Sequence, residues 1–478
     1  MGNPRRLKLR GASQIVVAFT KIIATLGPAS SDKQVVDTMR ENGLNCVRIN
    51  TAHGDPEQYK DLLGLVEKDP GIATMIDIKG PQIRIRLDEK LSLDEAETFV
   101  VGFAPDDVPR LNYDLYDDLD VGNTVFFDEG YVETTVASKT DGGVVLQVEH
   151  DATIRPGKGV NIPGTELDLP ALTEKDKHML EFAKKHSVDF VAQSFVRGPE
   201  DLAKTQEIIG DDPMKIIAKI ENHEGVNNLE EIISAGDGIM IARGDLGVEL
   251  PQQRIPALQK RMVKEAAEQS KISVVATQML ESMTESPKPT RAEVSDVANA
   301  VLDGADAVML SGETAIGEYP SQAVGTMREV AAAIEEDIPS DVAMDGYESI
   351  SEDMSLAAAT VGQHQDADAF VVIGSGTVQT RLLSRYRLCT QIISVTEKPR
   401  VARQLNLVWG ARSVLMEALP QEHIIPRAAK HVFDKGLVST DDTVVFYAGV
   451  GTDDHEAGNL VETHAVGEFL AYHDLLGR

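Results

Sequence analysis

Short runs of apolar, often β-branched residues recur along the chain, separated by segments with apolar residues at helical spacing. Near-continuous apolar runs of this length are typical of parallel strands buried on both faces. Segments 31–42 and 256–270 have the caps or the apolar periodicity of amphipathic helices. Eight strand–helix units predict a (β/α)8 TIM barrel, with a doubly wound open sheet as the alternative. The eight predicted strands are 21–25, 45–49, 73–77, 188–192, 215–219, 238–242, 272–276 and 306–310.

One interval between these strands is far longer than the others. Between Lys79 and Val188 lie 108 residues, too many for a connecting loop in a compact domain. The interval contains strand-like runs separated by Asp/Gly-rich turns, so we expect an all-β domain inserted after the third barrel strand, over the catalytic face, where it could act as a lid. Its predicted strands are 98–101, 124–127, 131–135 and 144–148. The expected limits are 81–170 for the lid and 21–80 plus 171–345 for the barrel.

The strand–helix pattern starts again after the barrel. A helix at 356–363 precedes runs at 369–373, 391–395, 412–415 and 443–447, which predict a C-terminal α/β domain with a parallel sheet over 346–478. The segment Gly374–Thr377 follows the first of these runs, at a strand–helix turn. Residues 1–20 are basic at first and then briefly apolar, and we expect an N-terminal extension without fixed structure.

Acidic residues number 77 and basic residues 46, a formal net charge of −31. Nucleic acids and anionic membranes select a basic surface, so neither is expected as a partner. The two cysteines, Cys46 and Cys389, form no metal-binding motif, and no apolar run is long enough to cross a membrane. These features predict a cytoplasmic enzyme with an acidic surface, as halophilic proteins have.

Polar and charged residues stand at the carboxyl ends of seven of the eight predicted barrel strands. In a barrel these ends converge on one face, where so many charges are hard to explain as packing. The cations Arg48, Lys219 and Arg243 suit a phosphate, and the carboxylates Glu221 and Asp245 suit Mg²⁺ or Mn²⁺ rather than Zn²⁺. Metal, lysine and arginine around one phosphoryl group indicate phosphoryl transfer.

Several segments resemble conserved stretches of the pyruvate kinase family, in the same order along the chain. They are Lys21–Ser30, Ile78–Pro81, Lys219–Gly225, Ala242–Gly247, Ala276–Leu280, Pro289–Glu293 and Leu310–Ala315. The resemblance covers about residues 20–450 and implies a barrel with an inserted lid, a C-terminal α/β domain and, usually, a homotetramer.

The resemblance implies transfer of a phosphoryl group from phosphoenolpyruvate to ADP, which gives pyruvate and ATP. It assigns roles to a set of residues in the barrel mouth and the lid. Arg48 and Lys219 would bind and neutralise the phosphoryl group, and Glu221 and Asp245 would hold Mg²⁺. Backbone N–H groups at Gly244 and Asp245 would bind the substrate carboxylate, and Thr277 would help to deliver a proton. The nucleotide would be contacted by Asn50, His53, Arg84 and Lys158.

The monovalent-cation site of the family is only partly matched. Its ligands would be Asn50, Asp77 and the Ile78 carbonyl, but Ala52 lacks the hydroxyl that the family uses, and Gln82 stands where many members have Glu. K⁺ therefore stays open as a cofactor. The Gly374–Thr377 loop resembles the loop that binds an effector phosphate in regulated members, with a plain strand–helix turn as the equal alternative. Two other functions remain as alternatives: a Mg²⁺-dependent barrel lyase or aldolase acting on pyruvate or phosphoenolpyruvate, and a non-catalytic scaffold.

Overall fold

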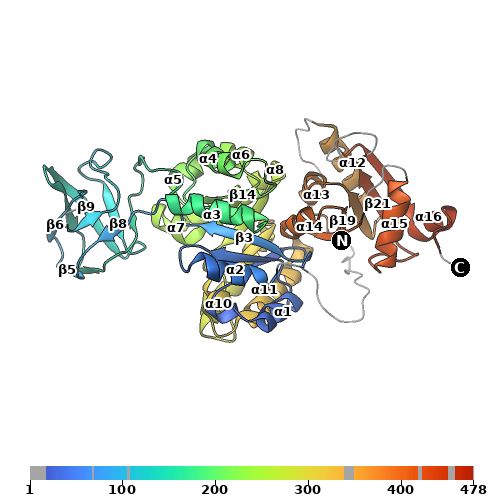
Figure 1. Cartoon of the computed structure of the whole chain (residues 1–478), viewed down its shortest axis with the longest axis horizontal. Helices are drawn as coiled ribbons and strands as arrows, with labels where there is room; N and C mark the ends of the chain where they lie inside the picture. Colours follow the sequence, from blue (N-terminus) through green and yellow to red (C-terminus); the bar gives the residue numbers. More distant parts are fainter. Residues whose placement is uncertain are drawn as a thin grey trace.

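Three units follow one another along the long axis of the molecule (Figure 1). The structure is a computed structural model and describes residues 18–66, 69–104, 108–338, 349–417, 423–449 and 458–476. In Figure 1 a small β unit lies at the left, a barrel surrounded by helices in the middle and an α/β unit at the right. No helix among the described residues is long and apolar enough to cross a membrane.

The middle unit is a closed barrel of eight parallel strands, which confirms the predicted (β/α)8 fold. The strands close in the order β1-β17-β16-β15-β14-β13-β3-β2. Almost all of their residues are buried because helices cover the outer face and side chains fill the interior. The strands are β1 (Lys21–Thr25), β2 (Cys46–Asn50), β3 (Ala73–Ile78), β13 (Phe190–Gln193), β14 (Lys215–Ile220), β15 (Gly238–Ala242), β16 (Ile272–Ala276) and β17 (Ala307–Leu310).

Helices connect the barrel strands, and several begin at side-chain caps. Asp32 caps the first helix, and Thr173 and Thr290 each form a reciprocal capping box with an acidic residue three positions later. The barrel helices are α1 (Lys33–Glu41), α2 (Pro56–Gly64), α3 (Glu174–Lys185), α4 (Pro199–Ile209), α5 (His223–Asn227), α6 (Leu229–Ala235), α7 (Arg243–Glu249), α8 (Ile255–Glu268), α9 (Arg291–Leu302), α10 (Gly312–Ala315) and α11 (Pro320–Ile334), with 3₁₀ turns at Pro28–Ser30, Gln252–Arg254, Glu281–Thr284 and Glu335–Asp337.

The left-hand unit is inserted between β3 and α3 and consists of strands alone among its described residues. A five-stranded sheet has the order β12-β8-β9-β10-β6, and β11 pairs with β5 and β4 with β7. The four predicted strands of this segment are all present, with several short strands beside them. The strands are β4 (Ile85–Arg86), β5 (Leu91–Leu93), β6 (Thr98–Val101), β7 (Arg110–Leu111), β8 (Thr124–Phe127), β9 (Val132–Thr140), β10 (Gly143–Val148), β11 (Ala152–Ile154) and β12 (Val160–Asn161).

The right-hand unit has a five-stranded sheet of order β20-β19-β18-β21-β22. The expectation of a parallel sheet was wrong at one edge, where β22 runs antiparallel to β21. The strands are β18 (Ala369–Ile373), β19 (Gln391–Thr396), β20 (Ala411–Leu415), β21 (Thr443–Ala448) and β22 (Leu460–Ala465), and the helices are α12 (Ile350–His364), α13 (Val378–Ser384), α14 (Pro399–Gln404), α15 (Ile424–Asp434) and α16 (Val466–Tyr472), with a 3₁₀ turn at Leu405–Leu407.

The expected N-terminal extension falls mostly outside the described residues, but its last part is firmly packed. Phe19 is buried and stacks on Trp409, with ring centroids 4.8 Å apart. The backbone N–H groups of Phe19 and Thr20 donate to the Glu335 carboxylate at 2.8 and 2.5 Å. An apolar ring and two paired amides therefore join residues 19 and 20, the last of the expected extension, to the rest of the structure.

A repeated contact holds the amino ends of the barrel strands, on the side facing the right-hand unit. The residue immediately before every second barrel strand (β2, β13, β15 and β17) accepts, through its side chain, a hydrogen bond from a backbone N–H in the neighbouring strand that precedes it in the chain. The pairs are Asn45 with Ile22, Asp189 with Thr74, Asp237 with Ile216 and Asp306 with Ser273, at 2.9–3.0 Å. These oxygens tie neighbouring strands together at the end of the barrel opposite the predicted site.

Candidate active site

Arg48 and Asp77 form a buried ion pair at the carboxyl ends of two adjacent strands. β2 and β3 pair in parallel, with Arg48 opposite Met75 and Asn50 opposite Asp77. Arg48 Nη2 lies 2.7 Å from Asp77 Oδ2, and its Nε donates to the same oxygen at 2.8 Å. Burial alone would raise the pKa of Asp77, but the charges of Arg48 and Lys219 outweigh it and lower that pKa. Asp77 is therefore a permanent anion that orients two cations.

Lys219 lies at the centre of this charged group. It projects from β14, and its Nζ is 2.7 Å from Ser194 Oγ, 3.2 Å from Asp77 Oδ1 and 2.9 Å from Glu221 Oε1. Burial would lower the pKa of Lys219, but the nearby carboxylates outweigh burial and raise that pKa. Lys219 is thus a fixed ammonium, suited to stabilising negative charge rather than to taking up a proton.

Two contacts of this centre come from residues to which the sequence assigned no role. Ser194 Oγ accepts from Lys219 and lies 3.4 Å from Asp77 Oδ1, and Thr25 Oγ1 accepts from Arg48 Nη1 at 2.8 Å. Both residues stand at or just after the carboxyl end of a barrel strand, β13 and β1 respectively. That position was the available signal, but serine and threonine are too common there to be selected by type.

Glu221 is a buried carboxylate and Asp245 a partly buried one, and the charge of Asp245 acts on Glu221. Glu221 Oε2 accepts from the Phe195 backbone N–H at 2.8 Å. Burial, with the Asp245 charge, raises the pKa of Glu221 to about 7, although Lys219 acts against the rise. Burial also raises the pKa of Asp245, again against the effect of Lys219. A divalent cation would relieve this crowding of negative charge, so the donor set fits a hard, oxygen-seeking metal.

The described residues include no cluster of three or more His, Cys, Asp or Glu that could hold a metal by themselves. Two carboxylates leave most positions of an octahedral ion to other oxygen ligands. Mg²⁺ commonly uses one or two carboxylates together with substrate phosphates and water. The set of two therefore fits a metal that binds together with a phosphorylated substrate.

Thr277 occupies a strained turn directly after β16. Its φ is +68°, a left-handed conformation that a β-branched residue rarely adopts. Thr277 Oγ1 accepts from the Gly244 backbone N–H at 2.8 Å, and Arg243 Nη2 donates to the Thr277 carbonyl at 2.6 Å. Arg243 also pairs with Asp296 at 2.7 Å. Arg243, predicted to be a mouth cation, thus holds the turn in place, and the turn places the Thr277 hydroxyl beside the start of α7.

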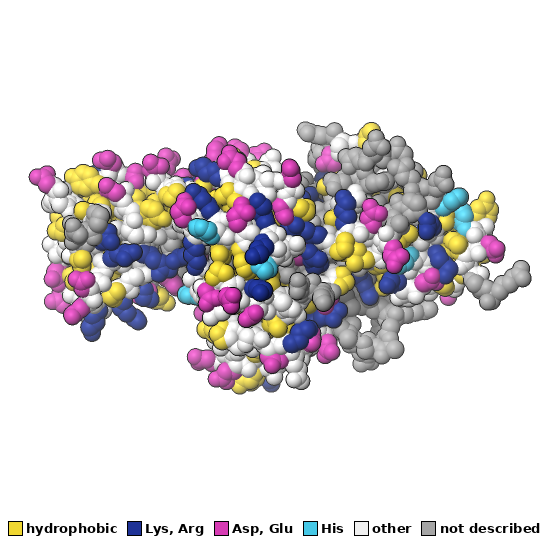
Figure 2. Space-filling model, in the orientation of Figure 1, with side chains coloured by type: hydrophobic (Ala, Val, Ile, Leu, Met, Phe, Trp, Pro, Cys, Tyr) yellow, Lys and Arg dark blue, Asp and Glu magenta, His cyan; other side chains and the backbone are white. Residues whose placement is uncertain are grey.

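The predicted lid cations lie next to each other on adjoining segments. Arg84 forms a bridge with Gly159, and Lys158 Nζ lies 2.6 Å from Asp128 Oδ1. Burial, followed by the charges of Arg84 and Lys175, lowers the pKa of Lys79, so these three cations belong to one electrostatic group. Figure 2 shows Lys and Arg side chains gathered where the lid meets the barrel, with Asp and Glu side chains scattered over the rest of the face in view.

The remaining predicted site residues follow β2. Asn50 Oδ1 accepts from the Ala52 backbone N–H at 3.0 Å, and His53 is exposed, with its carbonyl accepting from Tyr59 Oη at 2.7 Å. Ile78 ends β3 one residue after Asp77. The barrel therefore brings Arg48, Asp77, Lys219 and Glu221 into one cluster. Asn50 stands beside it, opposite Asp77 in the strand ladder, whereas His53 has no contact with the cluster among the described residues.

The arrangement can bind a phosphorylated anion and stabilise charge on it. Two buried cations face a pair of carboxylates suited to a divalent metal, and a third basic group lies on the lid side. Phosphoryl transfer depends mainly on positioning and charge neutralisation, which preorganised ion pairs provide without rearrangement.

Comparisons with known proteins agree with this chemistry. Residues 17–324 match the family model for the pyruvate kinase barrel domain, and residues 352–464 match the model for its alpha/beta domain. Pyruvate kinase from Clostridium acetobutylicum is 36% identical over 469 residues, which cover 94% of this chain and 99% of that protein. The Bacillus licheniformis enzyme is 37% identical over 489 residues, covering 96% and 82% respectively. The solved structure of a pyruvate kinase from Cryptosporidium parvum superposes with a TM-score of 0.90 at 32% identity, over 98% of this chain and all of that one.

Proposed function

The chain belongs to the pyruvate kinase family, and on that premise we propose the roles by which its residues transfer a phosphoryl group from phosphoenolpyruvate to ADP. The observation that carries the assignment of roles is the position of Lys219, a buried ammonium 2.7–3.2 Å from Ser194, Glu221 and Asp77. The bond between phosphorus and the enol oxygen breaks, and the terminal phosphate oxygen of ADP bonds to phosphorus. The enolate that leaves then takes a proton on carbon and becomes pyruvate.

Arg48 and Lys219 neutralise the oxygens of the transferring phosphoryl group. The Asp77 carboxylate holds both cations, at 2.7 and 3.2 Å, so they need no reorganisation when charge develops. Thr277 orients the carbon end of the substrate, and its hydroxyl belongs to the path by which the enolate carbon is protonated. The backbone N–H groups of Gly244 and Asp245 would bind the substrate carboxylate, which would take the place of Thr277 Oγ1 on the Gly244 N–H.

Glu221 and Asp245 would hold the divalent cation, Mg²⁺ or Mn²⁺. When bound, the ion supplies positive charge to the phosphate and carboxylate oxygens of the substrate. The Phe195 N–H fixes one oxygen of Glu221, so that this carboxylate is oriented before the metal arrives.

Arg84 and Lys158 contact the nucleotide phosphates from the lid side, with Asn50 and His53 contributing from the loop after β2. Lys79 and Lys175, to which the sequence assigned no role, extend this basic group. Cations on both sides draw a phosphate-bearing nucleotide between lid and barrel, although the whole chain carries a net charge of −31.

Because the monovalent-cation site lacks one oxygen ligand of the family pattern, we propose turnover without a K⁺ requirement. Both oxygens of Asp77 are engaged by Arg48 and Lys219, Asn50 Oδ1 accepts from Ala52, and Ala52 offers no side-chain oxygen.

The chain assembles as a homotetramer with an acidic, salt-tolerant surface. Light scattering would then give four times the chain mass of 51.8 kDa. The chain has 77 acidic and 46 basic residues, so its acidic side chains repel one another at low ionic strength. High salt screens this repulsion, and activity should therefore persist in molar salt.

A coupled assay of pyruvate release tests the reaction against the lyase or aldolase alternative. Pyruvate should appear only when phosphoenolpyruvate, Mg²⁺ and ADP are all present, with one ATP formed per pyruvate. Pyruvate released equally fast without ADP would refute the kinase assignment.

A further inference from the structure

Asp189 is a fully buried carboxylate at the amino end of the barrel, outside the active site. It stands immediately before β13, and its Oδ2 accepts from both the backbone N–H and the Oγ1 of Thr74 on β3, each at 2.9 Å. The contact is reciprocal, because the Asp189 backbone N–H donates to Thr74 Oγ1 at 3.1 Å. Burial raises the pKa of Asp189, and its hydrogen bonds from Arg403 and Thr74 act against that rise.

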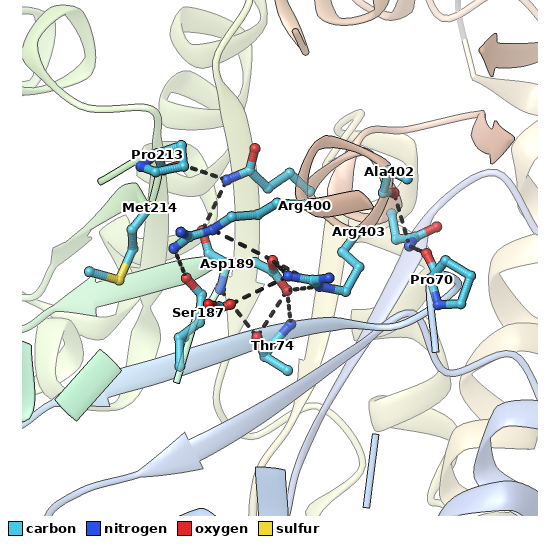
Figure 3. A network of polar contacts seen from close by, with 12 residues as sticks. Pro70, Thr74, Ser187, Asp189, Pro213, Met214, Arg400, Ala402 and Arg403 are labelled. Carbon is cyan, nitrogen blue, oxygen red and sulfur yellow. Dashed lines mark hydrogen bonds and ion pairs between the residues drawn. The ribbon is translucent and has the colours of Figure 1, made fainter. Parts of the chain in front are cut away.

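Arg403 of the C-terminal domain completes this contact. Its Nε lies 3.0 Å from both Asp189 carboxylate oxygens, and its Nη2 lies 2.9 Å from Oδ1. In Figure 3 Asp189 lies between Thr74 on one side and Arg400 and Arg403 on the other. A guanidinium that meets both oxygens of a carboxylate fixes its orientation as well as its charge.

The two strands that Asp189 joins carry catalytic contacts at their other ends. β13 pairs with β3 in parallel, with Phe190 opposite Met75 and Ala192 opposite Asp77. Ser194, just after β13, accepts the hydrogen bond from Lys219 and lies 3.4 Å from Asp77 on β3. The relative position of the two strands therefore determines where the partners of Lys219 stand.

This strand pair has no short connection to align it. The lid lies between β3 and β13, so Thr74 and Asp189 are 115 positions apart in the sequence. The ladder contains four residue pairs, and a slip of one residue would turn alternate side chains to the other face. A buried three-way contact at one end supplies the alignment that a short loop would otherwise provide.

We propose that Asp189 and Arg403 are positioning residues for phosphoryl transfer: together with Thr74 they hold β3 and β13 in register at the amino end, and so keep Asp77 and Ser194 aligned on Lys219. This inference rests on the proposed roles of Lys219 and Asp77. It makes the catalytic geometry depend on a side chain of the C-terminal domain.

A variant at Arg400 serves as the control that distinguishes this positioning role from simple docking of the C-terminal domain. It lies on the same helix, α14, and pairs with Asp212 at 2.8 Å and with the Val188 carbonyl; its own ion pair with Asp189 is long, at 4.0 Å, and it donates no hydrogen bond to that carboxylate among the described contacts. Gln404 also docks the helix, donating to the Pro213 carbonyl at 2.8 Å. Arg400→Gln therefore removes a docking contact of similar kind and leaves the link between Arg403, Asp189 and Thr74 in place.

Trp409 reports on docking independently of activity. It is the single tryptophan of the chain, is fully buried and donates its backbone N–H to Asp306 at 3.2 Å, at the boundary between barrel and C-terminal domain. Its emission would shift to longer wavelength if the two domains separated. Emission and melting temperature together thus show whether a variant keeps its assembled fold.

The experiment compares wild type, Arg403→Gln and Arg400→Gln in the full chain by coupled assay, Trp409 emission and thermal melting. We expect Arg403→Gln to lower kcat about 10- to 100-fold, the cost of small misplacements of reacting groups, with KM for ADP within about twofold and emission unchanged. Arg400→Gln should keep kcat within about twofold of wild type. If Arg403→Gln does not fold, Thr74→Val, which removes the hydroxyl inside the barrel, carries the same expectation.

Three results would overturn the proposal. One is wild-type kcat in a folded Arg403→Gln or Thr74→Val protein. Another is an equal loss of kcat in the two arginine variants. The last is a loss of kcat that follows the Trp409 shift, which would mean that docking alone is affected. A wild-type chain that makes no pyruvate with ADP would instead refute the proposed function.

Discussion

Replacing Lys219 with methionine removes one charge from the middle of the site and keeps most of the side-chain volume. The Nζ of Lys219 is within 3.2 Å of Asp77, Glu221 and Ser194, so the ammonium is held in place. The proposed function has this ammonium stabilise the charge that develops on the phosphoryl oxygens. The variant should therefore bind substrate but transfer the phosphoryl group slowly.

The size of the effect follows from electrostatics. Two unit charges about 4 Å apart interact by about 4 kcal/mol at an effective dielectric constant of about 20. Because about 1.4 kcal/mol changes a rate tenfold, this corresponds to about 10³ in kcat. Part of the ammonium charge is already balanced by Asp77 and Glu221, so we expect a loss of 10² to 10³, in the range found when one preorganised donor is removed.

The assay is the coupled release of pyruvate at saturating Mg²⁺ and ADP, with melting curves to check folding. Lys215→Met is the matched control, because Lys215 begins the same strand about 13 Å away and pairs with Asp237 at 3.0 Å, outside the site. The control should keep kcat within about twofold. A folded Lys219→Met protein with near wild-type kcat would show that the ammonium has no part in the transfer.

Three further predictions test the metal ligands, the cation requirement and the charge balance of the fold. Glu221→Gln should weaken Mg²⁺-dependent binding of phosphoenolpyruvate at least about tenfold in calorimetry, whereas Glu224→Gln should not; an unchanged Mg²⁺ titration would contradict the assignment. Exchange of Na⁺ for K⁺ at constant ionic strength should change kcat less than about twofold, and a saturable K⁺ requirement would show that a site exists despite Ala52. Burial lowers the pKa of Lys21 to about 8, against the effect of nearby carboxylates, so between pH 8 and 10 the unfolded chain binds more protons than the folded one. The free energy of unfolding, measured with urea, should therefore rise by up to about 1.4 kcal/mol per pH unit over that range. An equal rise in Lys21→Met would refute this.

Local patterns in the sequence predicted the elements and part of the site. All eight barrel strands lie within two residues of the predicted runs, because a strand buried on both faces must be apolar throughout. Lys219 and Glu221 were expected on one side of β14 from their spacing of two, and their side chains meet at 2.9 Å. The sequence also showed an acidic excess over the whole chain, against which the cations at the strand ends stand out.

The antiparallel β22 at the edge of the C-terminal sheet was missed for a physical reason. Its residues, Leu460–Ala465, are only partly buried and include Glu462 and His464, so they lack the continuous apolar signal of a central strand. An edge strand on a half-covered face needs fewer apolar side chains, and its direction depends on which neighbour it meets.

What the sequence determined by itself was the order of the barrel strands and the kind of chemistry at their ends, since both follow from residue type and short spacing. What only the tertiary structure decided was which distant groups meet. The hydroxyl of Ser194 joins Lys219 to Asp77, Thr277 takes a strained left-handed turn, and Arg403 reaches Asp189 across 214 positions. Closure of the barrel and docking of the C-terminal domain bring these residues together. Such contacts between distant residues cannot be predicted from the few residues on either side of each of them.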